Sequence, residues 1–277
     1  MTASPPASHS APSLEGPLDR LTLAALAVVA YALANLLHEV LGHGGACLLV
    51  GGHLTALSAV HAGCDIASAA AAGTVTAAGT VMNLCAGGLA WLLLRRQGDR
   101  LTHARYFAWL FMTVNLLQAA GYWLFSGLMG VGDWAALTAP LRPLWLYRSL
   151  LALAGGVGYW SAIVLSLRHL NTMLGDGANR LPRARTLALV PYFTGGALYV
   201  AAGVLNPVSP RLVIISAAAA SFGGTSALAW MTRQLATSRF PAGAGPALTL
   251  GRSWAWLAAA CVTLVVFVAV LGPGLRF

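Results

Sequence analysis

Long apolar runs recur along this chain of 277 residues, and they restrict its fold more than any other feature. An α-helix needs about 20 residues to cross a hydrocarbon core of about 30 Å. Seven runs are about this long, and we expect each to be a membrane span. The expected number of spans is seven, within a range of six to eight. The predicted spans are Leu21–Val50, Ala71–Leu94, Tyr106–Met129, Leu146–Leu167, Thr186–Leu205, Leu212–Met231 and Trp254–Leu271.

Composition favours helical spans over a soluble domain. Hydrophobic residues make up 58% of the chain and charged residues 8%, whereas a soluble domain carries about 25% charged residues. The runs lack the alternation of apolar and polar residues that marks the strands of a membrane barrel. Their backbone amides must then be paired within each segment, as they are in a helix. We predict an all-α fold, a polytopic transmembrane helical bundle over residues 21–277, with a flexible tail over residues 1–20.

All sixteen basic residues are arginines, and most of them fall in three loops between predicted spans. These loops carry Arg95, Arg96, Arg100 and Arg105, then Arg168, Arg180, Arg183 and Arg185, and finally Arg233, Arg239 and Arg252. The three loops share one side if the spans alternate, and the positive-inside rule makes that side cytoplasmic. We therefore expect a multi-pass protein of a bacterial plasma membrane with a cytoplasmic N-terminus. Topology accounts for the formal charge of +9, so no nucleic-acid partner is expected.

Six residues of the first run, His38-Glu39-Val40-Leu41-Gly42-His43, place ionisable groups in an apolar setting. Ionisable groups inside a membrane are costly and mark functional sites. The zinc-hydrolase motif H-E-x-x-H has its histidines at i and i+4, with a glutamate that activates water. Here the second histidine is at i+5, which puts the imidazoles about 140° apart on a regular helix. Either the pair holds no metal or the helix contains a π-bulge, which the neighbouring glycines favour.

A catalytic zinc takes three protein ligands and a water, so a third ligand is needed. Asp133, at the outer end of the third predicted span, is the favoured residue because its depth matches that of the histidines. Three residues of the loop after the first span compete with it: His53, His61 and Asp65. Cys47 follows His43 by four residues and is a reserve ligand.

The four cysteines show no paired spacing such as C-x-x-C. Cys47, Cys85 and Cys261 fall in apolar spans, and Cys64 falls in the loop after the first span. We expect buried free thiols rather than disulfides.

Several segments together resemble the site-2 protease family of membrane-embedded zinc metallopeptidases. The segments His38–His43 and Gly51–His53 resemble the start of that family, and Gly79–Leu84 resembles the segment that follows it. Asn115–Trp134 resembles the second motif, with Asp133 in the place of the third ligand. The resemblance covers about residues 30–135 and implies a metallopeptidase core there, with the helices of residues 146–271 added to it.

The chain departs from that family in two places. The first motif is one residue longer, and the second lacks the usual proline and the Leu-Asp-Gly ending. The longer form resembles the motif of the soluble dipeptidyl peptidase III zinc enzymes, in which that spacing accompanies a metal. The resemblance implies Zn²⁺ held by His38, His43 and Asp133, with Glu39 as the catalytic base.

The functional hypothesis is an intramembrane zinc metallopeptidase that hydrolyses peptide bonds of membrane-protein or peptide substrates. Asn83 or Asn115 either binds the substrate or pairs two helices. Tyr122 belongs to an expected aromatic belt on the outer side, and no comparable chemistry is expected in the later spans. The rival hypothesis is a noncatalytic membrane protein, either a proton- or metal-coupled transporter or an inactive scaffold. A transporter would be expected to repeat its motif in a second half, and the His-Glu segment occurs once.

Overall fold

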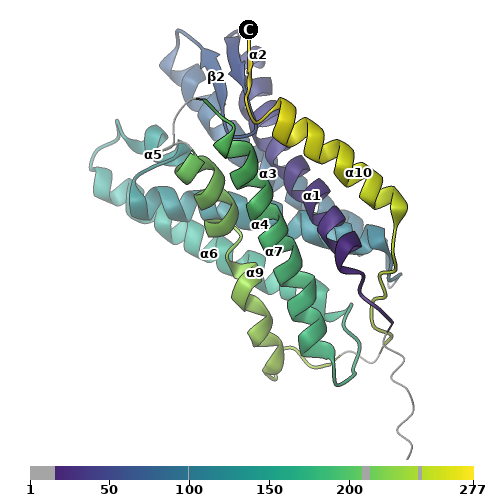
Figure 1. Ribbon diagram of the computed structural model, residues 1–277. Helices are drawn as coiled ribbons and strands as arrows, with labels where there is room; N and C mark the ends of the chain where they lie inside the picture. The colour runs from purple at the N-terminus through teal and green to yellow at the C-terminus, as the bar shows by residue number, and fades with distance from the viewer. Residues whose placement is uncertain (1–15, 99, 208–212, 243–244) are drawn as a thin grey trace, which may run out of the picture.

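The structure is a computed structural model that describes residues 16–98, 100–207, 213–242 and 245–277. Its main elements are helices, which lie side by side along one direction (Figure 1). They are α1 (Arg20–Leu36), η1 (Leu37–Gly44), α2 (Gly45–Leu49), α3 (Ala69–Arg96), α4 (His103–Met129), α5 (Asp133–Thr138), α6 (Leu144–Asn171), α7 (Arg180–Val204), η2 (Val213–Gly223), α9 (Ala227–Trp230), η3 (Met231–Ala236), α10 (Trp254–Leu264) and η4 (Val265–Val270). The predicted tail, residues 1–20, falls mostly on residues 1–15, which lie outside the described part of the chain.

Four helices are long and apolar enough to cross a membrane, judged by length and composition. They span Arg20–Leu49, which joins α1, η1 and α2, and Ala69–Arg96, Leu144–Asn171 and Arg180–Val204. They coincide with the first, second, fourth and fifth predicted spans, so a mainly helical fold with membrane-length apolar helices is confirmed. The total of seven spans stays a prediction.

The other three predicted spans differ from a simple apolar helix. The third corresponds to α4, a long helix whose buried face carries polar residues such as Asn115 and Gln118. The sixth predicted span starts at Leu212, outside the described residues, and is not one helix from Val213 onward. A turn after Gly223 separates η2 from α9. The seventh corresponds to the shorter apolar helix Trp254–Val270.

The all-α prediction misses a small sheet. Strand β1 (His53–Leu57) pairs antiparallel with β2 (Ala62–Asp65) on one side and with β3 (Leu275–Arg276) on the other. This sheet lies beside α2 and the C-terminus, at one end of the helices (Figure 1). The loop after the first apolar run therefore forms a hairpin, and that hairpin is held by the last residues of the chain.

The helix Arg20–Leu49 is the most buried of the four long helices, with 72% of its most apolar window inside the protein, against 28% for Leu144–Asn171. A central helix can carry ionisable side chains because it faces other helices rather than lipid. Its N-terminal end is held by Asp19, which accepts hydrogen bonds from Arg252 and from the backbone N–H of Thr22. The hydrogen bond from Arg252 holds the pKa of the Asp19 carboxyl well below its usual range.

Arginines cluster at this N-terminal end of the central helix. Besides Arg252, Arg183 donates a hydrogen bond to the carbonyl oxygen of Gly16. The sheet lies at the opposite end, after α2. The described part of the protein thus has one arginine-rich end and one end that carries a β-sheet.

Candidate metal centre

The His-Glu motif lies on a π-helical segment, η1, inside the central helix. A π-helix forms i→i+5 hydrogen bonds, so residues five apart come to lie on one face. The rings of His38 and His43 accordingly meet with their centroids 4.8 Å apart. The predicted π-bulge is confirmed, and the five-residue spacing is compatible with a shared site.

Asp133 completes a group of three possible ligands. Its Oδ2 atom lies 3.6 Å from Nε2 of His38 and 3.4 Å from Nε2 of His43, and the two Nε2 atoms are 3.2 Å apart. In the part of the chain that the structure describes, this is the one group of three His, Cys, Asp or Glu side chains with ligand atoms close enough to share an ion. The tertiary structure thus brings together the three residues that the sequence singles out.

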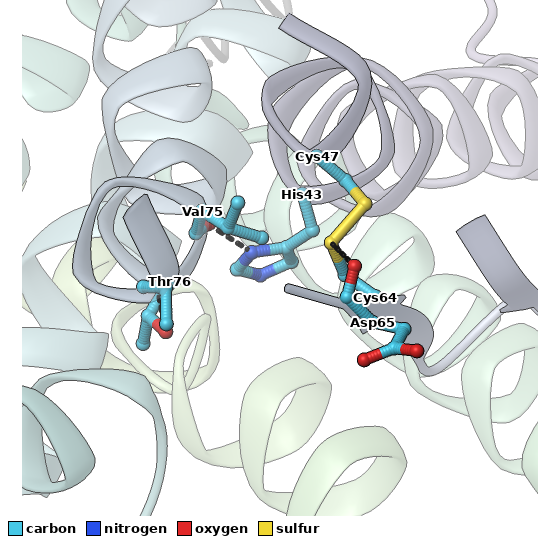
Figure 2. Close-up of a disulfide and its surroundings, with 7 residues drawn as sticks. His43, Cys47, Cys64, Asp65, Val75 and Thr76 are labelled. Carbon is cyan, nitrogen blue, oxygen red and sulfur yellow. Dashed lines mark hydrogen bonds between the residues drawn. A yellow bond between two sulfur atoms is a disulfide. The ribbon is translucent and has the colours of Figure 1, made fainter. Parts of the chain in front are cut away.

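The other ring nitrogen of each histidine has a hydrogen-bond acceptor. Nδ1 of His38 lies 2.5 Å from Oδ1 of Asn83, and Nδ1 of His43 lies 2.7 Å from the carbonyl oxygen of Val75 (Figure 2). The Asn83 amide is oriented by its Nδ2 atom, which donates to Oδ1 of Asn115 and to the carbonyl of Ala34. An amide or carbonyl oxygen only accepts, so both Nδ1 atoms must carry the hydrogen.

This tautomer leaves a lone pair on each Nε2 atom. Both lone pairs, together with an Asp133 carboxylate oxygen, therefore meet in one small space. His38 is 4% exposed, so little water is available to separate the three groups. Their repulsion is relieved only by a proton or a cation between them. Histidine metal ligands typically have this arrangement, with the second ring N–H bonded to a carbonyl or carboxylate.

A glycine leaves the space into which these ligand atoms point. A Cβ atom on Gly79 of α3 would lie 2.6 Å from Nε2 of His38 and 2.6 Å from Nε2 of His43. A Cβ atom on Gly42 would lie 2.6 Å from the Cα atom of Gly79. Helices η1 and α3 therefore meet backbone to backbone, and side chains at either position would push them apart or fill the site.

The short helix α5 holds Asp133 in place. Asp133 is its first residue and follows Gly132, whose φ of +88° favours glycine. The next residue, Trp134, donates a hydrogen bond of 2.9 Å from its indole N–H to Oγ1 of Thr80. Because Thr80 adjoins Gly79, this contact fixes α5 to the part of α3 that borders the histidines.

Glu39 is 6% exposed and lines a cavity of about 920 Å³ together with His43 and Asp133. The cavity runs between the hairpin, α3, α4 and η2. Tyr159 of α6 and Ser226 also line it and share a hydrogen bond of 3.1 Å. The later helices thus contribute to the site, which the sequence did not indicate.

The structure places the three alternative ligands on the hairpin. The alternative ligands His53, His61 and Asp65 do not belong to the group of three possible ligands, because they lie on the hairpin with exposed side chains. Of the three, His61 lines the cavity.

Asn83 and Asn115 are fully buried and bonded to each other. These two amides therefore pair helices α3 and α4 and are not exposed to a substrate.

The expectation of free, buried thiols is wrong. Cys47 and Cys64 form a disulfide, with their Cα atoms 5.9 Å apart (Figure 2). Cys85 and Cys261 are free but exposed. The hairpin folds strand β2 back onto the end of α2, which brings Cys64 to Cys47. Cys47 is therefore not a reserve ligand. The sequence signal was the position of Cys64, just beyond the run that contains Cys47.

Tyr122 was expected to belong to an aromatic belt, but its side chain also contacts His38. Its ring stacks on the imidazole of His38, with centroids 4.8 Å apart and an interplanar angle of 20°. Gln118, one turn earlier on α4, donates to the hydroxyl of Tyr199, which in turn donates to the carbonyl oxygen of Tyr31. Polar contacts therefore connect the site with α7 and α1.

The chain matches no family model, and no curated protein or solved structure matches it either.

Proposed function

We propose that this protein is a membrane-embedded zinc hydrolase that cleaves peptide bonds of membrane-protein or peptide substrates. The observation that carries the proposal is the convergence of His38, His43 and Asp133 in front of a cavity that Glu39 also lines. The resemblance of residues 30–135 to site-2 proteases agrees with this function.

The spacing of the three ligand atoms suits zinc. A tetrahedral zinc with bonds of about 2.0 to 2.1 Å to nitrogen and oxygen keeps its ligand atoms about 3.3 to 3.4 Å apart. The three separations at this site are 3.2, 3.4 and 3.6 Å. Two imidazoles and one carboxylate also match the ligand set of catalytic zinc sites, which keep the fourth position for water.

A bound zinc supplies two kinds of help, because it acidifies a water molecule and polarises a carbonyl oxygen. The protein's own residues handle the protons. Glu39 takes one proton from the attacking water and passes it to the leaving amine. The water oxygen bonds to the carbonyl carbon while the carbon–nitrogen bond breaks. The new carboxylic acid then gives its proton to the new amine, so the products are one carboxylate and one protonated amine.

The cavity supports a substrate that is largely apolar. Leu124, Phe125 and Leu128 of α4 line it, and no arginine does so among the described residues. A volume of about 920 Å³ is at the upper end of the usual range for small-molecule sites. An apolar peptide segment fits this description better than a small charged metabolite.

The two ends of the central helix support an orientation in a bacterial plasma membrane. Arginines gather at its start, the side that the positive-inside rule makes cytoplasmic. The disulfide between Cys47 and Cys64 lies at its other end, and disulfides persist in oxidising compartments. We infer that the N-terminus is cytoplasmic and that the metal site lies toward the outer side.

The test combines metal analysis with a search for cleavage products. Wild type and Glu39→Gln, purified in detergent, should each retain about one zinc per chain. His43→Ala and Asp133→Ala should lose it. Membranes of cells that express wild type should contain new protein N-termini that are absent with Glu39→Gln, since removal of a general base slows catalysis by about 10²- to 10⁴-fold.

A metal-free wild type, or full zinc occupancy in either ligand variant, would overturn the site. Zinc in the wild type without any product that depends on Glu39 would overturn the hydrolytic function and favour the noncatalytic alternative.

A further inference from the structure

The hydroxyl of Tyr122 has no hydrogen-bond partner within the part of the chain that the structure describes. Five of the other six tyrosine hydroxyls are engaged, those of Tyr31, Tyr106, Tyr159, Tyr192 and Tyr199, whereas Tyr147 in the first turn of α6 has no hydrogen bond among the described residues. A phenol inside a bundle normally finds a partner. The free hydroxyl of Tyr122 therefore requires an explanation.

This hydroxyl belongs to a residue that lines the cavity together with Glu39 and Asp133. The hydroxyl oxygen is not one of the fully buried side-chain atoms that lack a hydrogen-bond partner. Because it has no partner, it must be accessible, and the cavity gives that access. The free O–H group therefore belongs to a residue that borders the space in which the reaction would take place.

The ring of Tyr122 is held by its contact with a ligand. It lies nearly parallel to the imidazole of His38, which in turn meets His43 edge to face. A residue stacked in this way has little freedom to turn. A donor that is already in position costs no reorganisation during a reaction, which makes it effective at stabilising charge.

Other donors on the helices around the cavity are engaged elsewhere. The hydroxyl of Thr76 donates to the carbonyl of Ala72, the amide of Gln118 donates to Tyr199, and Tyr159 shares its hydrogen bond with Ser226. Peptide hydrolysis places negative charge on the carbonyl oxygen, and that charge needs a donor.

We infer that Tyr122 is a catalytic residue that donates a hydrogen bond from its phenol to the carbonyl oxygen of the scissile peptide. The inference rests on the hydrolytic function proposed above. The phenol keeps its proton throughout, so the proton transfers remain those of the water and Glu39. The alternative is that Tyr122 serves only to pack against His38.

Tyr122→Phe separates these two roles, because it keeps the ring and removes the hydroxyl. The variant should bind zinc, and after cobalt substitution its absorption spectrum should match that of the wild type. The affinities of two probes for the cobalt protein then test the effect of the missing donor. An N-phosphoryl dipeptide carries a tetrahedral anion like the transition state, whereas acetohydroxamate is planar and is held chiefly by chelation.

We expect Tyr122→Phe to bind the phosphoryl dipeptide about 10- to 100-fold more weakly than wild type, and acetohydroxamate within about twofold. For a peptide taken from a cleavage site found with wild type, kcat should fall about 10²- to 10³-fold with little change in KM. Tyr192→Phe is the matched control, since it removes a tyrosine hydroxyl that donates to Phe222. Its zinc content and probe affinities should equal those of wild type.

Equal affinity of wild type and Tyr122→Phe for the phosphoryl dipeptide would overturn the inference. Loss of zinc or of acetohydroxamate binding in Tyr122→Phe would do so too, because it would indicate a purely structural role. Failure of the hydrolytic function itself is read from a different comparison, that of wild type with Glu39→Gln.

Discussion

The Nε2 atoms of His38 and His43 face each other at 3.2 Å because Asn83 and Val75 occupy both Nδ1 atoms. Two imidazole lone pairs at this distance destabilise the folded protein unless a cation or proton joins them. At the scale of single residues, therefore, the groups around the histidines matter as much as the histidines themselves.

Gly79→Ala should abolish zinc binding, because the added Cβ would lie 2.6 Å from both Nε2 atoms. The matched control is Gly88→Ala on the same helix, where an added Cβ has no neighbour within 4 Å. Both changes exchange glycine for alanine within the same helix and raise its intrinsic helix propensity alike, so the clash at Gly79 is what distinguishes them. Zinc content of the two purified variants is the measurement. A normal zinc content in purified Gly79→Ala would contradict this geometry.

Asn83→Ala should weaken zinc binding by about 10- to 100-fold, the usual effect of removing the partner of a ligand histidine. The loss of the acceptor frees His38 to turn and to change tautomer. The measurement is zinc affinity by competition with a chelator, on protein whose folding is checked by size-exclusion chromatography. Asn179→Ala is the control, because Asn179 is exposed and lies before α7. Similar affinities in the two variants would mean that Asn83 does not position the ligand.

Single residues differ in how far the sequence predicts them. His38, Glu39 and His43 stand out because ionisable groups are rare in apolar runs. Asp133 could be proposed by depth and elimination. Gly79 and Tyr122 could not, since glycines and aromatic residues are common in membrane helices and only their neighbours give these two a role.

At the scale of elements, the central helix changes its winding where the motif lies. The segment η1 brings residues five apart onto one face, and Gly42 on it allows α3 to approach. The spacing of the histidines predicts this π-helix, because a regular helix would separate them. The hairpin of β1 and β2 was not predicted, and β1 has a second partner, β3, at the far end of the chain.

The disulfide joins two such elements, the end of α2 and strand β2, across 17 residues of sequence. Cys64→Ser should lower the unfolding temperature, because closure of a loop of roughly this length stabilises a protein by about 3 kcal/mol in the chain-entropy model. Thermal unfolding in detergent, with and without reductant, is the measurement. Cys85→Ser is the control, because Cys85 is a free, exposed thiol, and it should behave as wild type does. A wild type that reacts with four equivalents of a thiol reagent before reduction would rule out the disulfide.

At the scale of the whole molecule, the two ends of the described chain lie at opposite ends of the bundle. Asp19, just before α1, pairs with Arg252 at the arginine-rich end. The last residue, Phe277, donates its backbone N–H to the carbonyl of Thr55 in the hairpin. The C-terminus therefore lies at the end of the bundle that carries the disulfide.

A C-terminal reporter tests this arrangement. Alkaline phosphatase fused after Phe277 should be active, because it folds only outside the cytoplasm, and a green fluorescent protein at the same position should be dark. The same two reporters fused after Arg96, at the arginine-rich end of α3, serve as the internal control and should give the reverse result. An inactive phosphatase at the C-terminus would contradict the orientation.

By itself, the sequence determined that this is a mainly helical protein with membrane-length apolar helices and a His-Glu motif inside one of them. The physical reason is that a bilayer acts on each stretch of about 20 residues separately, so local composition is enough. Only the tertiary structure decided that Asp133 meets the histidines, that Gly79 leaves room beside them, and that Cys64 reaches Cys47. These contacts join residues that are distant along the chain, and their distances follow from how the helices and the hairpin pack.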